Sequence, residues 1–444
     1  MYKKNRRRSQ IIKKRILLSL CVFVLVATLA IVSVVVFSIF SPDKTDKNIS
    51  SKPQASKPEP EPIKESYATV LSIGDIMVHS PQLNGAYLPA AGVYDFTDFF
   101  KEISPYFMSA DLSVANLEVT FGSTAAGAYS GYPLFNCPDS LADAIKSSGL
   151  NFLVTANNHS YDTGYAGLVR TAQVLKEKGI EFVGTRENTN DRTYAVKEIN
   201  DIKIGIANYT YETSNANTPI GTKFLNGNYL NADAVPLVNS FNYYRLDDFY
   251  ADVQATIDGM KSEGAEFITF YMHWGNEYKT VENTWQQTIA QQLSNMGVDL
   301  IIGSHPHVIE PARLIHSEDG QRTTICLYSA GNAVSNQRQE LMDSCPSGHT
   351  EDGLIFSYTL KKYGEDVSLE SVKVIPTWVN KYPVEGRNKY TIYPMEAPDW
   401  GTVKYGLNST AASKAANSYE RTKAILAEGL TEIQNALGCE VTFN

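Results

Sequence analysis

Residues 294–303 read Ser294-Asn-Met-Gly297-Val-Asp-Leu-Ile-Ile-Gly303, and here a glycine separates the end of an amphipathic helix from an apolar strand. Glycine just past a helix end accepts the left-handed conformation that terminates a helix, and a short step from helix to strand is usual in α/β folds. The same pattern recurs at Gly149, Gly179 and Gly264. Helices and strands that alternate in this way predict an α/β fold with layered sheets.

Further elements are predicted on both sides of these four units. Asn200-Asp201 separates two alternating runs, which predicts a hairpin. Residues 212–247 are rich in Asn, Gly, Thr and Tyr and have weak periodicity, so we interpret them as an insertion over one edge of the sheet. The other predicted elements are two early strands at 69–74 and 112–117, the hairpin strands at 194–198 and 202–209, further antiparallel strands at 322–328, 353–361 and 369–378, a helix whose Trp285, Ile289, Leu293 and Met296 share one face, and a long C-terminal helix at 413–437.

Residues 16–40 carry no charge, and they follow a segment with eight Lys or Arg among residues 1–15. At 1.5 Å per residue the uncharged run could span roughly 37 Å, enough for a hydrocarbon core of about 30 Å. The positive-inside rule then places residues 1–15 in the cytoplasm. A cleaved signal peptide is the alternative, but its apolar stretch is usually about 7–15 residues and ends at small side chains. We predict a single-pass cell-membrane protein with an uncleaved transmembrane helix at 16–40 and an extracellular main domain.

Composition constrains the rest of the chain. Residues 41–66 hold five Pro, five Ser, five Lys and five acidic residues, which predicts a disordered linker. The net charge is −9 although the N-terminus is basic, so the main body is acidic and nucleic acid is not an expected partner. Cys21 lies in the predicted anchor, and the other four cysteines allow three full pairings, among which the sequence favours none.

Metal-ligating side chains come just after five of the predicted strands. In α/β sheets, ligands bind outside the carboxyl ends of the strands, so these segments predict one shared metal centre. A donor set of carboxylate, amide and imidazole without thiolate favours Mn, Fe or Zn in a catalytic site, and a carboxylate can bridge two ions. The residues are Asp75, Glu118, Asn158, His159, His273, His305 and His307.

Three histidines and one aspartate have more ordinary interpretations. His316 and His349 are expected to be surface or hydrogen-bonded residues, and the same interpretation is favoured for His79. Asp162 precedes a helix that starts near Gly164, so it could equally be an N-cap or a functional residue.

Six ordered motifs carry a family resemblance. They are Ser72-Ile-Gly-Asp75, Ala115-Asn-Leu-Glu118, Ala156-Asn-Asn-His159-Ser-Tyr-Asp162-Thr-Gly164, Met272-His273-Trp-Gly-Asn-Glu277-Tyr, Gly303-Ser-His305-Pro-His307 and Tyr328-Ser-Ala-Gly-Asn332. With them the chain resembles the bacterial capsule-synthesis CapA family, which is associated with poly-γ-glutamate production and is related to calcineurin-like metallophosphoesterases. The resemblance covers residues 67–379, and it implies a metallophosphatase-like sheet sandwich flanked by helices. Residues 380–444 would then be a C-terminal helical extension.

The resemblance also implies roles for the candidate residues. Asp75 and His307 would hold one divalent ion. Asn158, His273 and His305 would hold a second ion, and Glu118 would bridge the two. His159 would be the general acid, and Asp162 is the second catalytic candidate.

Two positions depart from the wider superfamily. Met77 stands where a histidine is usual, so the first ion would be weakly held or completed by His79 or water. Glu118 stands where aspartate is usual, which changes its reach by one methylene. Both departures argue against ordinary phosphoesterase activity.

Three functions follow as hypotheses. The leading one is a membrane-tethered, metal-dependent hydrolase or transferase that acts on an anionic cell-surface or capsular polymer. The alternatives are a non-catalytic subunit of a capsule synthesis or export complex, and a generic metallophosphodiesterase. The expected partners are the polymer, the membrane and subunits of a capsule-synthesis complex.

Overall fold

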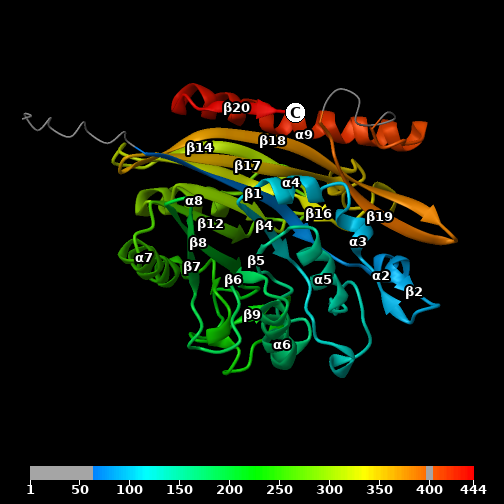
Figure 1. Ribbon diagram of the computed structural model, residues 1–444. Helices are drawn as coiled ribbons and strands as arrows, with labels where there is room; N and C mark the ends of the chain where they lie inside the picture. The colour runs from blue at the N-terminus through cyan, green and yellow to red at the C-terminus, as the bar shows by residue number, and fades with distance from the viewer. Residues whose placement is uncertain (1–63, 397–403) are drawn as a thin grey trace, which may run out of the picture. The chain divides into compact units, whose positions relative to one another are not determined.

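The structure is a computed structural model that describes residues 64–396 and 404–444 (Figure 1). The predicted cytoplasmic tail, the transmembrane helix and nearly all of the linker lie outside these residues. Within the described part of the chain, none of the helices has the length and apolar character that crossing a membrane requires. The first strand begins at Glu65, and Ser66 pairs with Lys362 of a neighbouring strand, so the predicted linker extends two residues too far.

One mixed sheet has the order β19-β18-β17-β1-β4-β5-β6, with β16 on β1 and β20 on β18. Strands β1, β4, β5 and β6 are parallel, whereas β17 runs antiparallel to β1 and starts an antiparallel half that continues through β18 and β19. The strands are β1 (Glu65–Ile76), β4 (Leu112–Leu117), β5 (Phe152–Val154), β6 (Glu181–Val183), β16 (Asn332–Val334), β17 (Asp352–Tyr363), β18 (Asp366–Val384), β19 (Arg387–Pro394) and β20 (Glu440–Phe443).

The second mixed sheet has the order β11-β8-β12-β13-β15-β14, with β7 on β8. Its strands are parallel except β7 and β14, which pair antiparallel with β8 and β15. The strands are β7 (Tyr194–Ile199), β8 (Ile202–Tyr211), β11 (Ser240–Phe241), β12 (Phe267–His273), β13 (Leu300–Ser304), β14 (Ile309–His316) and β15 (Thr323–Ala330). Two short hairpins stand apart from both sheets: β2 (Tyr87–Leu88) with β3 (Val93–Tyr94), and β9 (Phe224–Leu225) with β10 (Asn228–Tyr229).

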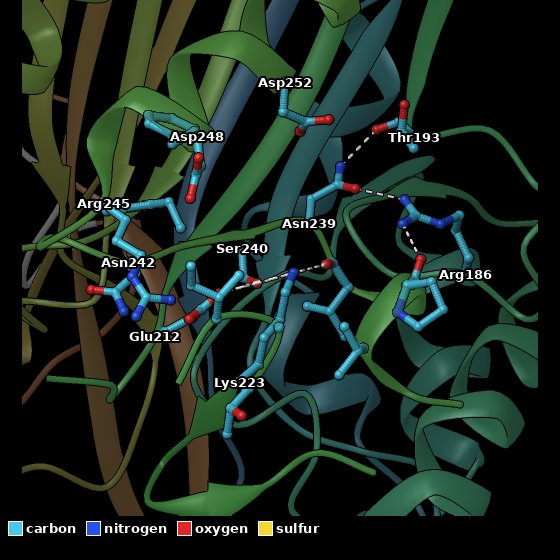
Figure 2. A pocket seen from close by; sticks show the side chains of 18 residues that line it. Arg186, Thr193, Glu212, Lys223, Asn239, Ser240, Asn242, Arg245, Asp248 and Asp252 are labelled. Atoms are coloured by element: carbon cyan, nitrogen blue, oxygen red, sulfur yellow. Dashed lines mark hydrogen bonds and ion pairs between the residues drawn. The ribbon is translucent and has the colours of Figure 1, made fainter. Parts of the chain in front are cut away.

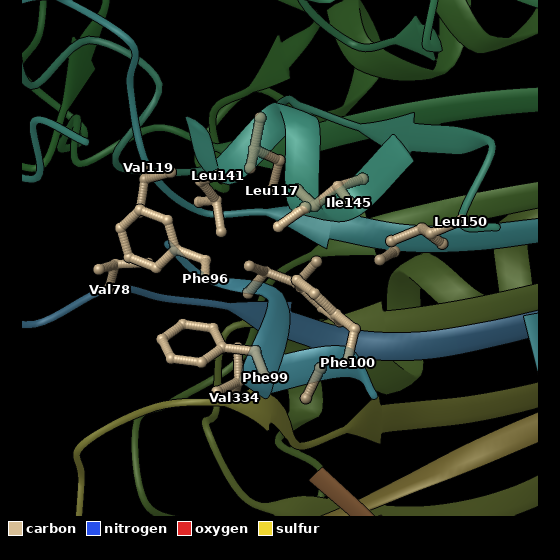
Figure 3. Close-up of a cluster of buried hydrophobic side chains, with 14 of the residues drawn as sticks. Val78, Phe96, Phe99, Phe100, Leu117, Val119, Leu141, Ile145, Leu150 and Val334 are labelled. Atoms are coloured by element: carbon tan, nitrogen blue, oxygen red, sulfur yellow. The ribbon is translucent and has the colours of Figure 1, made fainter. Parts of the chain in front are cut away.

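The two sheets pack face to face through a buried apolar layer that includes Val114 of the first sheet and Leu300 of the second. Helices α2 to α6 cover the outer face of the first sheet, where Phe96, Phe99 and Phe100 fill a core (Figure 3). Helices α7 and α8 cover the outer face of the second sheet. The helices are α2 (Ser80–Ala86), α3 (Thr97–Phe100), α4 (Ser104–Ser109), α5 (Ser140–Ser147), α6 (Gly164–Glu177), α7 (Leu246–Ser262), α8 (Thr284–Met296) and α9 (Ser409–Leu437).

The predicted connections are confirmed where a positive φ angle was expected. Gly297 closes α8 with φ of 94°, and the glycines of the other three recurring units are also left-handed. Asn200 and Asp201 have φ of 51° and 70° and join β7 to β8 as the predicted hairpin. Two positive φ angles match the right-handed twist of the paired strands.

The structure corrects two expectations, the domain boundary at 379 and the antiparallel pairing of the strand at 322–328, and refines two others. The boundary between residues 379 and 380 falls inside β18, which continues to Val384 and pairs with β19, so the C-terminal segment is part of the sheet as well as helical. Residues 212–247 supply β11, which extends the second sheet. Strand β15 pairs parallel with β13, and only β14 runs antiparallel to it. Trp285, in the first turn of α8, is 42% exposed and has the Tyr243 ring beside it, whereas Ile289 and Leu293 of the same face are fully buried.

Candidate metal centre

The seven predicted metal-centre residues are all buried, and they meet where β1, β4, β5, β12 and β13 end. Three groups of side chains place possible ligand atoms within 4.8 Å of one another. Two of these groups share Glu118, and two share His307. The groups are Asp75 with Glu118 and His307, Glu118 with His273 and His305, and Glu277 with His305 and His307. The cluster can therefore hold a metal ion.

Asp75 and Glu118 are held in place by the Asn116 side chain, which comes from β4. The Asn116 amide donates to Asp75 Oδ1 at 2.8 Å and to Glu118 Oε2 at 3.2 Å. The other Asp75 oxygen lies 3.1 Å from His307 Nδ1, and His307 Nε2 lies 3.8 Å from Glu118 Oε1. Because one amide fixes both carboxylates, their oxygens face the same space as the His307 ring.

His273 closes the other side of the cluster at the end of β12. Its Nδ1 lies 2.9 Å from Ser304 Oγ, which fixes the orientation of the ring. Its Nε2 then lies 2.8 Å from Asn158 Oδ1 and 3.7 Å from Glu118 Oε1. The His305 ring lies beside it, with centroids 4.9 Å apart. Nitrogen and oxygen donors thus converge on Glu118 from two sides.

The turn after β13 has an unusual backbone. His305 and His307 have φ of 97° and 58°, and Pro306 stands between them. Positive φ is strained for residues with a side chain, and such strain is concentrated at functional sites. The preceding Gly303 is required by space, because a Cβ there would lie 1.7 Å from the Tyr328 carbonyl oxygen. Glycine at this position therefore allows β13 to approach β15 closely just before the turn that carries both histidines.

The electrostatics of the cluster fit a bound cation. Glu118 Oε1 and His305 Nδ1 are buried and have no hydrogen-bond partner within the described residues. Burial, and then the nearby Asp75 carboxylate, raise the pKa of Glu118 well above its usual value. Burial also lowers the pKa of His273 and His305, so both imidazoles are neutral and can act as ligands. Divalent transition metals take this set of N and O donors.

His159 and Asp162 form a pair next to the cluster. His159 Nδ1 lies 2.7 Å from Asp162 Oδ2, and that oxygen also accepts the Phe135 backbone N–H at 2.7 Å. The Phe135 ring meets the imidazole edge-on at 4.8 Å. Asp162 makes no side-chain cap of α6, whose N-cap is Thr163, so the N-cap interpretation is wrong. The carboxylate instead holds the histidine ring.

His79 and Met77 lie outside the three groups of ligand atoms. His79 Nδ1 accepts the Asn336 backbone N–H at 3.3 Å, and burial lowers the pKa of this histidine to about 4. Met77 is buried in the apolar core under the sheet. The structure thus uses His79 as a hydrogen-bonded residue beside the centre, in line with the ordinary interpretation.

Two residues of the site were not among the predicted candidates. Glu277 is exposed and brings a carboxylate to His305 and His307, and its only sequence signal was its place in the motif after His273. Asn116 could have been suspected as a polar residue within a strand that is otherwise mostly apolar. The four cysteines Cys137, Cys326, Cys345 and Cys439 are free and buried, so none of the open pairings occurs.

Comparison with known proteins places the chain in a family. The family model described as bacterial capsule synthesis protein PGA_cap matches residues 69–337. The capsule biosynthesis protein CapA of Bacillus anthracis is 25% identical over 304 residues, which are 67% of this chain and 64% of that protein. The chain thus spans slightly less than two thirds of that relative.

Two further similarities come from Bacillus subtilis. Its PGA biosynthesis protein CapA is 25% identical over 326 residues, which are 70% of this chain and 73% of that protein. The crystal structure of its calcineurin-like phosphoesterase YfkN is 13% identical, with a TM-score of 0.37 over 81% of this chain and 98% of that chain. On the family match, which agrees with the six motifs, the chain belongs to the bacterial capsule synthesis protein family PGA_cap.

Proposed function

We propose that this protein is a metal-dependent hydrolase or transferase of capsule synthesis that acts on an anionic cell-surface polymer such as poly-γ-glutamate. The observation that carries the proposal is the pair of ligand groups that share Glu118, with the His159–Asp162 pair beside them. Family membership supports the link to capsule synthesis. The same proposal places the main domain outside the cell, tethered through residues 16–40.

The roles are those that the family resemblance implies, and two of the three groups of ligand atoms agree with them. Asp75 and His307 would hold one ion, Asn158, His273 and His305 a second, and Glu118 would bridge them. Mn, Fe or Zn bound there would polarise a phosphoryl or carbonyl oxygen and activate water. Such ions would also attract an anionic polymer to an acidic protein.

His159 would move the proton. When its Nδ1–H donates to Asp162, Nε2 of the neutral ring can take a proton from a nucleophile, and Nε2–H of the imidazolium can give a proton to a leaving group. Burial of both side chains keeps water from competing for the hydrogen bond between them. Asp162 thus acts as a positioning residue for the His159 ring.

A turnover screen tests this proposal. The full chain, loaded with Mn²⁺, is given γ-linked polyglutamate, aryl phosphomonoesters and aryl phosphodiesters, and the products are followed by chain length and absorbance. We expect metal-dependent cleavage or transfer on the polymer, and about a 10²–10⁴-fold lower rate for His159→Asn because general acid catalysis is lost. Turnover of the aryl phosphodiester alone would instead favour a generic metallophosphodiesterase.

One observation favours a second function, a non-catalytic subunit of a capsule synthesis or export complex. Met77 replaces a usual ligand of the first ion, and His79 does not join the groups of ligand atoms. If this alternative holds, cells that carry His273→Ala with His305→Ala should make capsule normally, whereas loss of residues 16–40 should abolish it. Loss of capsule in the double variant at normal protein abundance would exclude the subunit function.

A further inference from the structure

A cavity of about 300 Å³ lies at the edge of the second sheet (Figure 2). It is formed by the segment before β9, by β11, by the residue after β8 and by the start of α7. The end of β8 separates it from the metal centre. The Tyr211 ring lies 4.7 Å from the His305 ring, whereas the next residue, Glu212, lines the cavity. Ligand pockets run from roughly 300 to 1,000 Å³, so this cavity suits a small molecule.

Arg186 brings a buried positive charge to this cavity. Its side chain comes from the segment after β6, and the residue is only 7% exposed. Its guanidinium donates to Asn239 Oδ1 at 2.6 Å and to the Pro236 carbonyl oxygen, both of which are neutral. No carboxylate of the described residues forms an ion pair with it within 4.0 Å. A buried charge without a counter-charge is unfavourable, so this site favours an anion.

Two more cations line the same cavity, and Figure 2 shows Lys223 between Arg186 on one side and Arg245 on the other. Lys223 Nζ donates to Ser240 Oγ at 2.8 Å, and its nearest carboxylate oxygen, on Glu212, is 3.9 Å away. Arg245 donates to the Thr218 carbonyl oxygen and, among the residues described, forms no ion pair. Of these three cations only Lys223 forms an ion pair within the described residues, the one with Glu212, in a chain whose net charge is −9.

The remaining charges of the cavity are acidic and lie on α7. Asp248 and Asp252 are exposed, and neither forms an ion pair with the three cations. We propose that this cavity binds a small organic acid, whose carboxylate is held by Arg186, Lys223 and Arg245. An amino group on the same ligand would face Asp248 and Asp252. This site uses none of the proposed metal ligands, so it goes beyond the proposed function and does not rest on it.

Calorimetric titration of the full chain in EDTA tests the proposal without any bound metal. The probes are glutarate, glutamate, a γ-linked glutamate oligomer and inorganic phosphate. We expect at least one of the three carboxylate probes to bind with a Kd below about 1 mM, which corresponds to roughly −4 kcal/mol. If glutarate or glutamate binds with a lower Kd than the oligomer, the ligand is a free acid. If the oligomer binds with the lower Kd, the ligand is the end of a polymer. Either result supports the site.

Variants show whether the binding occurs in this cavity. Lys223→Met and Arg245→Gln should each raise the Kd for the carboxylate probe at least tenfold. Arg186→Lys should retain more affinity for that probe than Arg186→Gln. Lys414→Gln, which changes a half-buried lysine of α9 that pairs with Glu340 outside this cavity, is the matched control and should leave the Kd unchanged. Thermal melts confirm that each variant folds. Binding of phosphate but of no carboxylate, or equal Kd values in Lys223→Met and the unmodified chain, would overturn the proposal.

Discussion

Glu118 and Glu310 are two buried carboxyl groups that the fold treats differently. Both are 0% exposed, and each has an Oε1 atom without a hydrogen-bond partner within the described residues. Burial raises the pKa of both, in the case of Glu310 to about 8. Around Glu118, however, stand His273 and His307, with ring nitrogens at 3.7 and 3.8 Å. Glu310 accepts the Gln286 amide at 2.6 Å, and no group of possible metal ligands in the described residues includes it.

This difference separates two ways of neutralising a buried carboxyl group. Glu310 lies next to an amide and near Glu282, whose negative charge adds to the effect of burial, so a proton is the simplest counter-charge. Glu118 lies among imidazole rings whose nitrogens can bind a metal ion, so one ion can accept both the carboxylate and the imidazoles as ligands. Burial alone does not make a metal site, and the ligands around the carboxylate decide the outcome.

The largest effect is expected from Glu118→Gln. The amide cannot bridge two ions as a carboxylate does, so metal affinity should fall more than 100-fold, or about 2.7 kcal/mol. Metal competition with a chromophoric chelator measures the change. Glu310→Gln is the matched control, because it makes the same substitution in an equally buried residue outside the centre. Equal loss of metal in both variants would remove the distinction between the two carboxyls.

Glu310→Gln should instead change the dependence of stability on pH. The folded-state pKa of about 8 lies above the unfolded value of about 4.5, so the stability contributed by the proton is fully present below pH 4.5 and is lost as pH rises through 8. Between pH 5 and pH 8 the unmodified chain should lose roughly 2–4 kcal/mol more than the variant. Urea unfolding in EDTA at the two pH values measures this, and parallel pH profiles would contradict the assignment.

Asn116→Ala tests the positioning of the two carboxylates. Without its amide, Asp75 Oδ1 and Glu118 Oε2 lose a shared donor, and metal affinity should fall about 10–100-fold with the ligands intact. The same competition assay measures it, and Asn388→Ala is the control because Asn388 is exposed and lies on β19, which supplies none of the candidate ligands. An unchanged affinity would mean that the carboxylates hold their places without the amide.

Glu277→Gln should have the smallest effect. Its carboxylate is exposed, so water can replace it beside His305 and His307. We expect a loss of metal affinity of less than tenfold. A loss as large as that of Glu118→Gln would show that Glu277, and not Glu118, is the principal carboxylate of the centre.

The sequence predicted those parts of the molecule that depend on local pattern. The strand at Leu112–Leu117 has the predicted bounds, because parallel strands buried on both faces are almost continuously apolar. The position of the candidate residues just after strands could be predicted in the same way. The cluster does not lie at the edge of one sheet, however, because β1, β4 and β5 belong to the first sheet and β12 and β13 to the second. Asn116 was missed because it lies within a strand, and Glu277 because it is in a turn.

Other features depend on contacts between distant segments. The cavity between Arg186 and Arg245 joins the segment after β6 to the start of α7, and residues 212–247 have too little periodicity to predict how they fold between them. The boundary near residue 379 was misplaced because β18 runs for 19 residues, well beyond the usual 3–10 for a strand. Its length is maintained by pairing with β17 and β19, which no local pattern indicates.

Everything proposed for the metal centre depends on Glu118 and its neighbours holding transition-metal ions. The most direct test is elemental analysis of the full chain, loaded with Mn²⁺ and dialysed, beside His273→Ala combined with His305→Ala. We expect close to two ions per unmodified chain and about one in the folded double variant, because Asp75, Glu118 and His307 remain to hold the other ion. An unmodified chain that retains no metal, or a double variant that retains as much as the unmodified chain, would contradict this expectation.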